Sequence, residues 1–177
     1  MIAPSRLLKI LGLALVVFLV AGGTYYYFFE SIVSGPGPET FADEYNLVLQ
    51  NYQGEDVELS EFKREILVVH TWASWCPYCG EEIQNLTKLT DIYGDDVTIL
   101  AVNRGEPKDE AIAFTNALGV GDKIVFLLDP TDSFYKKLEG YAMPETVFIN
   151  KRGAVIFHQR GPMKIQEVVE KINQLVQ

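Results

Sequence analysis

The sequence predicts an α/β domain with a central mixed sheet and helices on both faces, preceded by a single apolar N-terminal segment. Within the 177 residues, apolar runs rich in β-branched side chains alternate with amphipathic stretches, which is typical of sheet strands joined by helices. The uncharged run at residues 10–29 has the length of a transmembrane helix. Both cysteines, Cys76 and Cys79, lie where one apolar strand pattern meets an amphipathic helix pattern. Length and pattern together indicate one domain with an N-terminal appendage.

The N-terminal segment is expected to anchor the chain in the cytoplasmic membrane. The uncharged run at residues 10–29 is long enough to cross a hydrocarbon core as a helix. Arg6 and Lys9 precede this run and Glu30 follows it, so the positive-inside rule places residues 1–9 in the cytoplasm. We therefore expect a single-pass protein whose C-terminal domain lies on the periplasmic, extracytoplasmic side of the membrane.

A cleaved signal peptide is the alternative for this segment, because small residues occur at positions 21–23. The apolar run continues well past them to Phe29, which favours an uncleaved signal-anchor. Residues 30–40 contain the turn-forming sequence SGPGP and are expected to form a linker, followed by the domain at 41–177. The net charge of −9 disfavours nucleic acid as a partner.

Each element of the domain is predicted from a local pattern. A hairpin is expected around residues 53–56, which are turn-forming and flanked by two short β-rich runs. Residues 66–71 show no polar alternation until His70, which is typical of a central strand covered on both faces. The helix that begins at the cysteines should end at Gly94. The expected strands are residues 45–52, 57–59, 66–71, 97–102, 124–128, 146–149 and 154–159, and the expected helices are residues 76–93, 107–118, 132–138 and 165–176.

The cysteine pair is the candidate reactive group. Two cysteines three residues apart cannot join distant parts of a fold, so we expect them to matter for their reactivity. Thiol exchange requires a thiolate, an accessible attacking sulfur and a second sulfur that resolves the mixed disulfide. The unpaired amides and the dipole of a helix N-terminus stabilise a negatively charged sulfur. Cys76 is therefore the candidate exposed nucleophile, and Cys79, one turn later and facing inward, is the candidate resolving thiol. Pro77 suits the first turn because it lacks an N–H.

A metal half-site is the alternative for this pair. A four-ligand site of cysteine and histidine would need both histidines of the chain, His70 and His158, and the usual ligand spacing is missing. We therefore expect no metal and no other cofactor.

Residues 72–79, WASWCPYC, resemble the active-site segment of the thioredoxin superfamily. Residues 143–150, MPETVFIN, resemble its second signature, a cis-proline that opens a strand. The distance between the two motifs is similar to that in the branch with an inserted helix and strand. With the N-terminal anchor, the chain resembles the membrane-tethered thiol-disulfide oxidoreductases of the TlpA/ResA type. The resemblance implies a thioredoxin-like fold over residues 41–176.

The resemblance also implies a substrate-binding edge. A cis X-Pro bond costs only about 0.5–1 kcal/mol, and at Pro144 it would turn the preceding backbone outward. Met143 would then face Cys76 and offer its polar backbone groups to an extended substrate segment. An ordinary trans proline at a strand start is the alternative.

Three residues next to the cysteines, Trp75, Pro77 and Tyr78, are candidates for contact with a substrate. Trp75 is expected to shield the site and to shape the surface around it. Packing of its ring into a pocket is the alternative.

Two further residues are candidates for moving protons. His70 lies six residues before Cys76, where the resemblance places a buried acid that handles the proton of Cys79. A core histidine with one hydrogen bond is the alternative, because burial disfavours the charged imidazole. Glu106 follows the strand that begins the insertion, where the resembling branch has an acid close to the cysteines. A solvated loop glutamate is the alternative there.

These observations predict an enzyme that exchanges dithiol and disulfide with partner proteins outside the cytoplasmic membrane. The resemblance favours a reductant, for example of apocytochrome c thiols or of another redox protein, with a membrane partner that regenerates it. A disulfide-forming oxidant stays open. So do two functions of other classes, a copper metallochaperone that uses both cysteines with His158 or Met143, and a tethered binding domain with an inert disulfide.

Overall fold

A computed structural model of the chain describes residues 20, 22–25, 47–62 and 65–176. The chain divides into two compact units, Met1–Pro38 and Glu39–Gln177. In the first unit, Val20 and residues 22–25 are helical. Among the described residues, none of the helices combines the length and the apolar character needed to cross a bilayer. Most of the predicted anchor at residues 10–29, and all of the linker at 30–40, lie outside the described residues.

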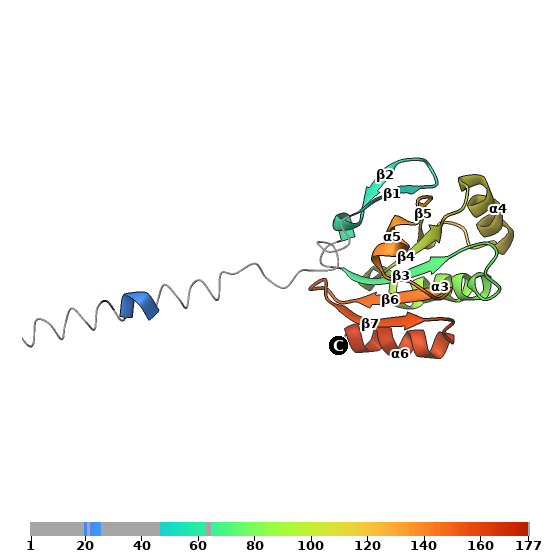
Figure 1. Ribbon diagram of the computed structural model, residues 1–177. Coiled ribbons are helices and arrows are strands. Elements are labelled where there is room, and N and C mark those ends of the chain that lie inside the picture. Colours follow the sequence, from blue (N-terminus) through green and yellow to red (C-terminus); the bar gives the residue numbers. More distant parts are fainter. Residues whose placement is uncertain (1–19, 21, 26–46, 63–64, 177) are drawn as a thin grey trace, which may run out of the picture. The chain divides into compact units, whose positions relative to one another are not determined.

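The second unit is built on one seven-stranded mixed sheet (Figure 1), which confirms the predicted α/β class. The strand order is β2-β1-β5-β4-β3-β6-β7. Strands β3, β4 and β5 run parallel to one another, whereas β1, β6 and β7 pair antiparallel to their neighbours. The strands are β1 (Val48–Asn51), β2 (Asp56–Glu58), β3 (Ile66–Trp72), β4 (Val97–Arg104), β5 (Val125–Asp129), β6 (Glu145–Ile149) and β7 (Val155–Arg160).

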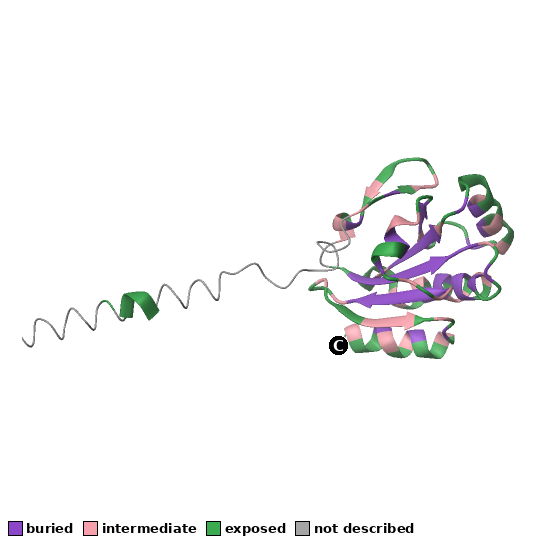
Figure 2. Cartoon of the chain, in the orientation of Figure 1, coloured by how far each residue is buried: buried purple, intermediate pink, exposed green. Residues whose placement is uncertain are grey.

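The helices cover both faces of this sheet, as predicted. Side chains of α3, α4 and α6 share one apolar cluster with alternate residues of β3 and β4, and side chains of α5 belong to a second cluster with the other residues of these strands. All seven residues of β3 are therefore buried (Figure 2), which explains its unbroken apolar pattern. The helices are α3 (Cys79–Tyr93), α4 (Lys108–Leu118), α5 (Ser133–Lys137) and α6 (Ile165–Val176), with 3₁₀ turns at Leu59–Phe62 and Gly94–Asp96.

Helix α3 begins later than predicted, at Cys79 rather than at Cys76. Residues 73–78 form a turn that leaves the end of β3, and the Cys76 amide donates to the Ala73 carbonyl across it. The prediction placed Pro77 within the first turn, but Pro77 precedes the helix. Gly80 lies where α3 meets α4, because a Cβ there would be 3.3 Å from Leu118 and from Phe114.

Candidate active site

The two cysteines form a disulfide at the carboxyl end of β3. Cys79 is the first residue of α3 and is fully buried. Cys76 is only 3% exposed, so the expectation of an exposed Cys76 is wrong for this disulfide form. The physical reason is that Cys76 lies before the helix and its sulfur is bonded to that of Cys79 inside the first turn. The disulfide therefore lies just beneath the surface.

Exposed side chains surround this disulfide. Trp75 is 62% exposed and Tyr78 is 56% exposed, and Pro77 between the cysteines is exposed as well. Trp75 thus does not fill an internal pocket, which removes the packing alternative for its ring. Aromatic side chains that are held at the surface next to a reactive group are well suited to contact a protein partner.

Pro144 lies at the same edge of the sheet as the disulfide. The Met143–Pro144 peptide bond is cis, as the resemblance implied. Strand β6 pairs antiparallel with β3, with Glu145 opposite Thr71, so Pro144 lies beside the residues with which β3 enters the cysteine turn. Met143 is half-buried and packs against the apolar cluster that contains both cysteines. The two sequence motifs are therefore neighbours in the fold.

Glu106 holds the turn that carries Cys76. Its side chain is buried, so the solvated alternative is wrong. The carboxylate accepts a hydrogen bond from the Ser74 amide at 2.8 Å, a second from the Ser74 hydroxyl and a third from the Asn103 amide group at 2.6 Å. Glu106 is thus a direct support of the residues before Cys76.

His70 is fully buried in the middle of the sheet, on the α3 face. Its Nδ1 lies 3.0 Å from the Thr146 hydroxyl, and its Nε2 has no hydrogen-bond partner among the described residues. Burial lowers the pKa of His70 from 6.5 to about 3, because the charged imidazole would lose its hydration. The ring is therefore neutral at neutral pH, which fits the alternative of a core histidine.

Glu82 is a buried acid that was not predicted from the sequence as a site residue. It lies one helical turn after Cys79, and its carboxylate accepts the Met163 amide at 2.7 Å and comes within 3.6 Å of His70 Nδ1. Burial raises the pKa of Glu82 to about 7, the Met163 hydrogen bond lowers it, and the charge of Glu81 raises it. A carboxyl group with this pKa can take up or release a proton near neutral pH.

The sequence profile of the Redoxin family matches residues 38–175. The chain belongs to the Redoxin family. This Redoxin chain is 27% identical to the thiol-disulfide oxidoreductase ResA of Halalkalibacterium halodurans over 172 residues, which cover 94% of this chain and 92% of ResA. It is 29% identical to the thiol:disulfide interchange protein DsbE of Vibrio cholerae over 161 residues, 86% of this chain and 85% of DsbE. Together with the disulfide, these similarities identify a thioredoxin-like thiol-disulfide oxidoreductase.

Solved structures agree with the thioredoxin-like fold of this Redoxin chain. DsbF of Mycobacterium tuberculosis (MTB) superposes with a TM-score of 0.69 at 20% identity, covering 75% of this chain and 96% of DsbF. StoA of Bacillus subtilis gives a TM-score of 0.61 at 22% identity, covering 71% of this chain and 95% of StoA.

The spacing of the helix could have pointed to Glu82 in this Redoxin chain. Cys79, Ile83 and Leu86 lie on the inner face of α3, and a residue three positions after Cys79 falls on the same face. Its partners could not be found in this way. Met163 lies 81 residues away along the chain, and only the folded structure brings its amide to the carboxylate.

The free energy of unfolding of Glu82→Gln, measured relative to that of the wild type, should be higher at pH 8 than at pH 5. The folded-state pKa of about 7 lies above the ordinary value of 4.5, so the wild type loses stability as the pH rises between these values. Glutamine carries no charge and can still accept the Met163 amide. After allowance for solvent screening, we expect a relative gain on the order of 1–2 kcal/mol in urea unfolding.

The control for this experiment is Glu170→Gln, which removes an exposed charge from the middle of α6. Its unfolding free energy should keep the pH dependence of the wild type to within about 0.5 kcal/mol. An equal pH dependence in Glu82→Gln and the wild type would show that Glu82 does not titrate near neutral pH.

Proposed function

We propose that this Redoxin protein is a membrane-tethered, extracytoplasmic oxidoreductase that reduces disulfides in partner proteins. One observation carries the proposal, namely the cysteine pair at the start of α3, placed at the sheet edge where Pro144 opens β6. The similarity to ResA and DsbE over most of both chains supports a function of this type. The uncharged run at residues 10–29 supports the tether, and the basic residues before it support the extracytoplasmic side.

The exchange takes place in two steps that begin from the dithiol form. The Cys76 thiolate attacks one sulfur of the substrate disulfide, which forms a mixed disulfide and releases the other substrate sulfur as a thiolate. The Cys79 thiolate then attacks the Cys76 sulfur and releases the second substrate sulfur. Two electrons have passed to the substrate, whose two sulfurs take up two protons. The chain is left with the Cys76–Cys79 disulfide.

The surrounding residues have distinct roles in this proposal. Trp75, Tyr78 and Met143 contact the substrate segment, with Pro144 and Pro77 shaping the surface on either side of Cys76. Glu106 supports the turn that presents Cys76. Glu82 is a better candidate than His70 for taking the proton of Cys79, because it lies one helical turn away and has a pKa near neutral pH.

The direction of electron transfer and the partner proteins are part of the same proposal. The resemblance to the TlpA/ResA type favours a reductant that acts on apocytochrome c or on another exported redox protein, and that is regenerated by a redox protein of the membrane. The dipeptide Pro77-Tyr78 between the cysteines does not by itself decide the direction, since such sites have intermediate potentials.

The reduction potential of the full chain tests the direction. Equilibration with a glutathione redox buffer should give a value nearer to about −270 mV, typical of thioredoxin, than to about −120 mV, typical of the strong periplasmic oxidant. A value near the latter would contradict the reductant and favour the alternative, a disulfide-forming oxidant. The matched control is Cys79→Ser, which cannot form the internal disulfide and should show no two-electron transition.

The metallochaperone alternative finds little support around the cysteines. Among the described residues, no three side chains of histidine, cysteine, aspartate or glutamate lie close enough to hold a metal ion together. The metallochaperone would use His158, but the Nε2 atom of His158 lies 2.7 Å from Oε2 of Glu145. Stoichiometric retention of Cu(I) without any disulfide reduction would favour the metallochaperone.

A further inference from the structure

Another buried carboxylate, that of Glu145, lies on the opposite face of the sheet from Glu82. Successive residues of a strand face opposite sides, and the next residue, Thr146, contacts His70 on the α3 face. Glu145 directly follows Pro144 and is 0% exposed. Its Oε1 accepts the amides of Tyr141 and Ala142, each at 2.8 Å. The carboxylate thus bends back and binds the turn that leads to Pro144.

The other carboxylate oxygen, Oε2, is bound from the neighbouring strand β7. His158 places Nε2 2.7 Å from Oε2, and Arg160 places Nε 3.9 Å from it. The Arg160 guanidinium also lies 4.9 Å from the centre of the Tyr141 ring, which is itself 79% exposed. A buried carboxylate needs such donors, because it has lost its hydration. His158 is therefore the closest donor that β7 supplies to Glu145.

The turn at residues 140–142 is also held by α5. The Tyr135 hydroxyl donates to the Ala142 carbonyl and lies 3.5 Å from Glu145 Oε1. The Tyr135 ring lies directly against Gly140, where an added Cβ would come within 2.4 Å of it. Burial, and next the charge of Glu145, raise the pKa of Tyr135, so the hydroxyl keeps its proton as a donor. Glu145 and Tyr135 together fix the backbone of this turn.

We propose that His158 is a positioning residue for substrate binding. By donating to Oε2, it keeps the Glu145 carboxylate oriented so that Oε1 receives the Tyr141 and Ala142 amides, and so it fixes the turn that presents Met143 beside the disulfide. The inference rests on the proposed function, because this turn is the edge offered to the substrate. Loss of the donor loosens the turn and weakens substrate binding, whereas the thiol chemistry of Cys76 and Cys79 continues.

The test uses the full chain with insulin as the model disulfide. His158→Ala should raise KM about tenfold, the loss expected for one charge-assisted hydrogen bond, while kcat and the reduction potential stay within about twofold and about 10 mV. His158→Gln should restore KM to within about twofold of the wild type, because its amide N–H can reach Oε2. A side chain that served only as packing would not be rescued by glutamine in this way.

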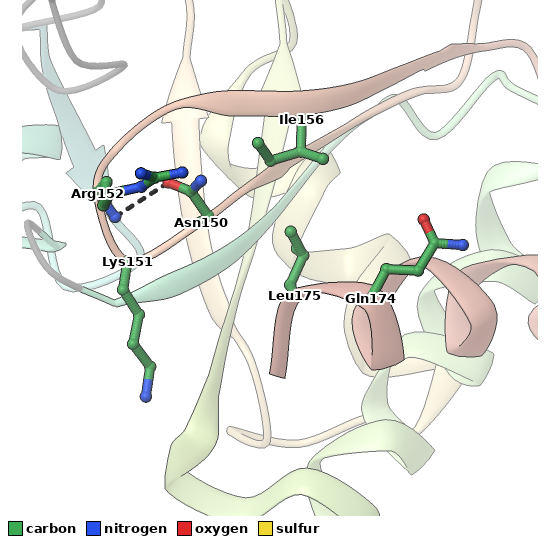
Figure 3. A pocket seen from close by; sticks show the side chains of 6 residues that line it. All are labelled: Asn150, Lys151, Arg152, Ile156, Gln174 and Leu175. Carbon is green, nitrogen blue, oxygen red and sulfur yellow. Dashed lines mark hydrogen bonds between the residues drawn. The ribbon is translucent and has the colours of Figure 1, made fainter. Parts of the chain in front are cut away.

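The matched control is Ile156→Thr on the same strand. Ile156 is 49% exposed and lines a surface pocket of about 390 Å³ between the β6–β7 hairpin and the end of α6 (Figure 3). The strand register pairs Glu145 with Arg160 and Ile149 with Val155, so this pocket lies at the far end of β7 from Glu145. The variant should keep the KM of the wild type.

Two results separate the failure of this inference from failure of the proposed function. A wild type that does not reduce insulin would contradict the proposed function. An active wild type with an unchanged KM in His158→Ala, or with kcat falling in place of KM, would overturn the role of His158. If His158→Ala does not fold, hydrogen exchange of the wild type decides. The Tyr141 and Ala142 amides should exchange at least about tenfold more slowly than in a free peptide, and free-peptide rates would overturn the inference.

Discussion

The Cys79→Ser chain should accumulate as a mixed disulfide with its substrate, whereas Cys76→Ser should lose exchange altogether. Cys76 lies in the turn before α3, between two exposed aromatic residues in the sequence, and is the attacking sulfur of the proposed function. Cys79 is fully buried and can act only on Cys76. Because both residues act in one reaction sequence, loss of Cys76 should lower the rate of insulin reduction on the order of 10³-fold or more.

Each reduced variant is incubated with a peptide that contains a disulfide, and the adduct is measured by non-reducing gel electrophoresis and mass spectrometry. The double serine variant is the control and should form no adduct. If Cys76→Ser traps the peptide and Cys79→Ser does not, the two roles are reversed. If neither single variant forms an adduct, the disulfide is inert, and the chain is a binding domain.

Replacing Trp72 with alanine should lower the free energy of unfolding by about 3–5 kcal/mol. Trp72 is the last residue of β3 and is fully buried. Its ring stacks on Phe114 of α4 with centroids 5.5 Å apart and meets Phe126 of β5 edge-on at 6.3 Å. Removing the ring leaves a cavity where β3, α4 and β5 meet, directly below the cysteine turn. The melting temperature should fall by roughly 10 °C or more.

Trp72→Phe is the matched control for this experiment. It keeps an aromatic ring in the same place and removes Nε1, which has no hydrogen-bond partner among the described residues. We expect a cost of about 1–2 kcal/mol, which is smaller than that of alanine. Equal losses for phenylalanine and alanine would mean that the ring packing at Trp72 contributes little.

The parts of the fold that could be predicted are those specified by a pattern within a short stretch of the sequence. The strand β3 is visible because all of its residues are buried, so polar residues are nearly absent from it. The helix α6 was predicted with the boundaries observed, Ile165–Val176, because one face alone is apolar. The cysteine pair and the proline segment are short motifs, and both could be recognised without knowing where the rest of the chain lies.

The contacts that surround the site could not be predicted, because their partners are distant in sequence. His70 meets Thr146 across a separation of 76 residues, and Glu82 meets Met163 across 81. Glu145 was visible only as part of the proline motif, and its bond to His158 depends on the register of β6 and β7. The burial of Cys76 could not be predicted from the sequence either. Its exposure was expected because the helix was predicted to begin at Cys76, whereas it begins three residues later.

The burial of the disulfide limits its reaction with small thiols. A thiolate must approach one sulfur closely to break the bond, and at 3% and 0% exposure neither sulfur leaves much room for a reagent arriving at random. In the proposed function, a partner that binds Trp75 and Tyr78 is held next to the disulfide, whereas a free thiol is not. Burial is therefore expected to slow reduction of the disulfide by free thiols, so that its reduction depends on a docked partner, such as the membrane redox protein proposed to regenerate it.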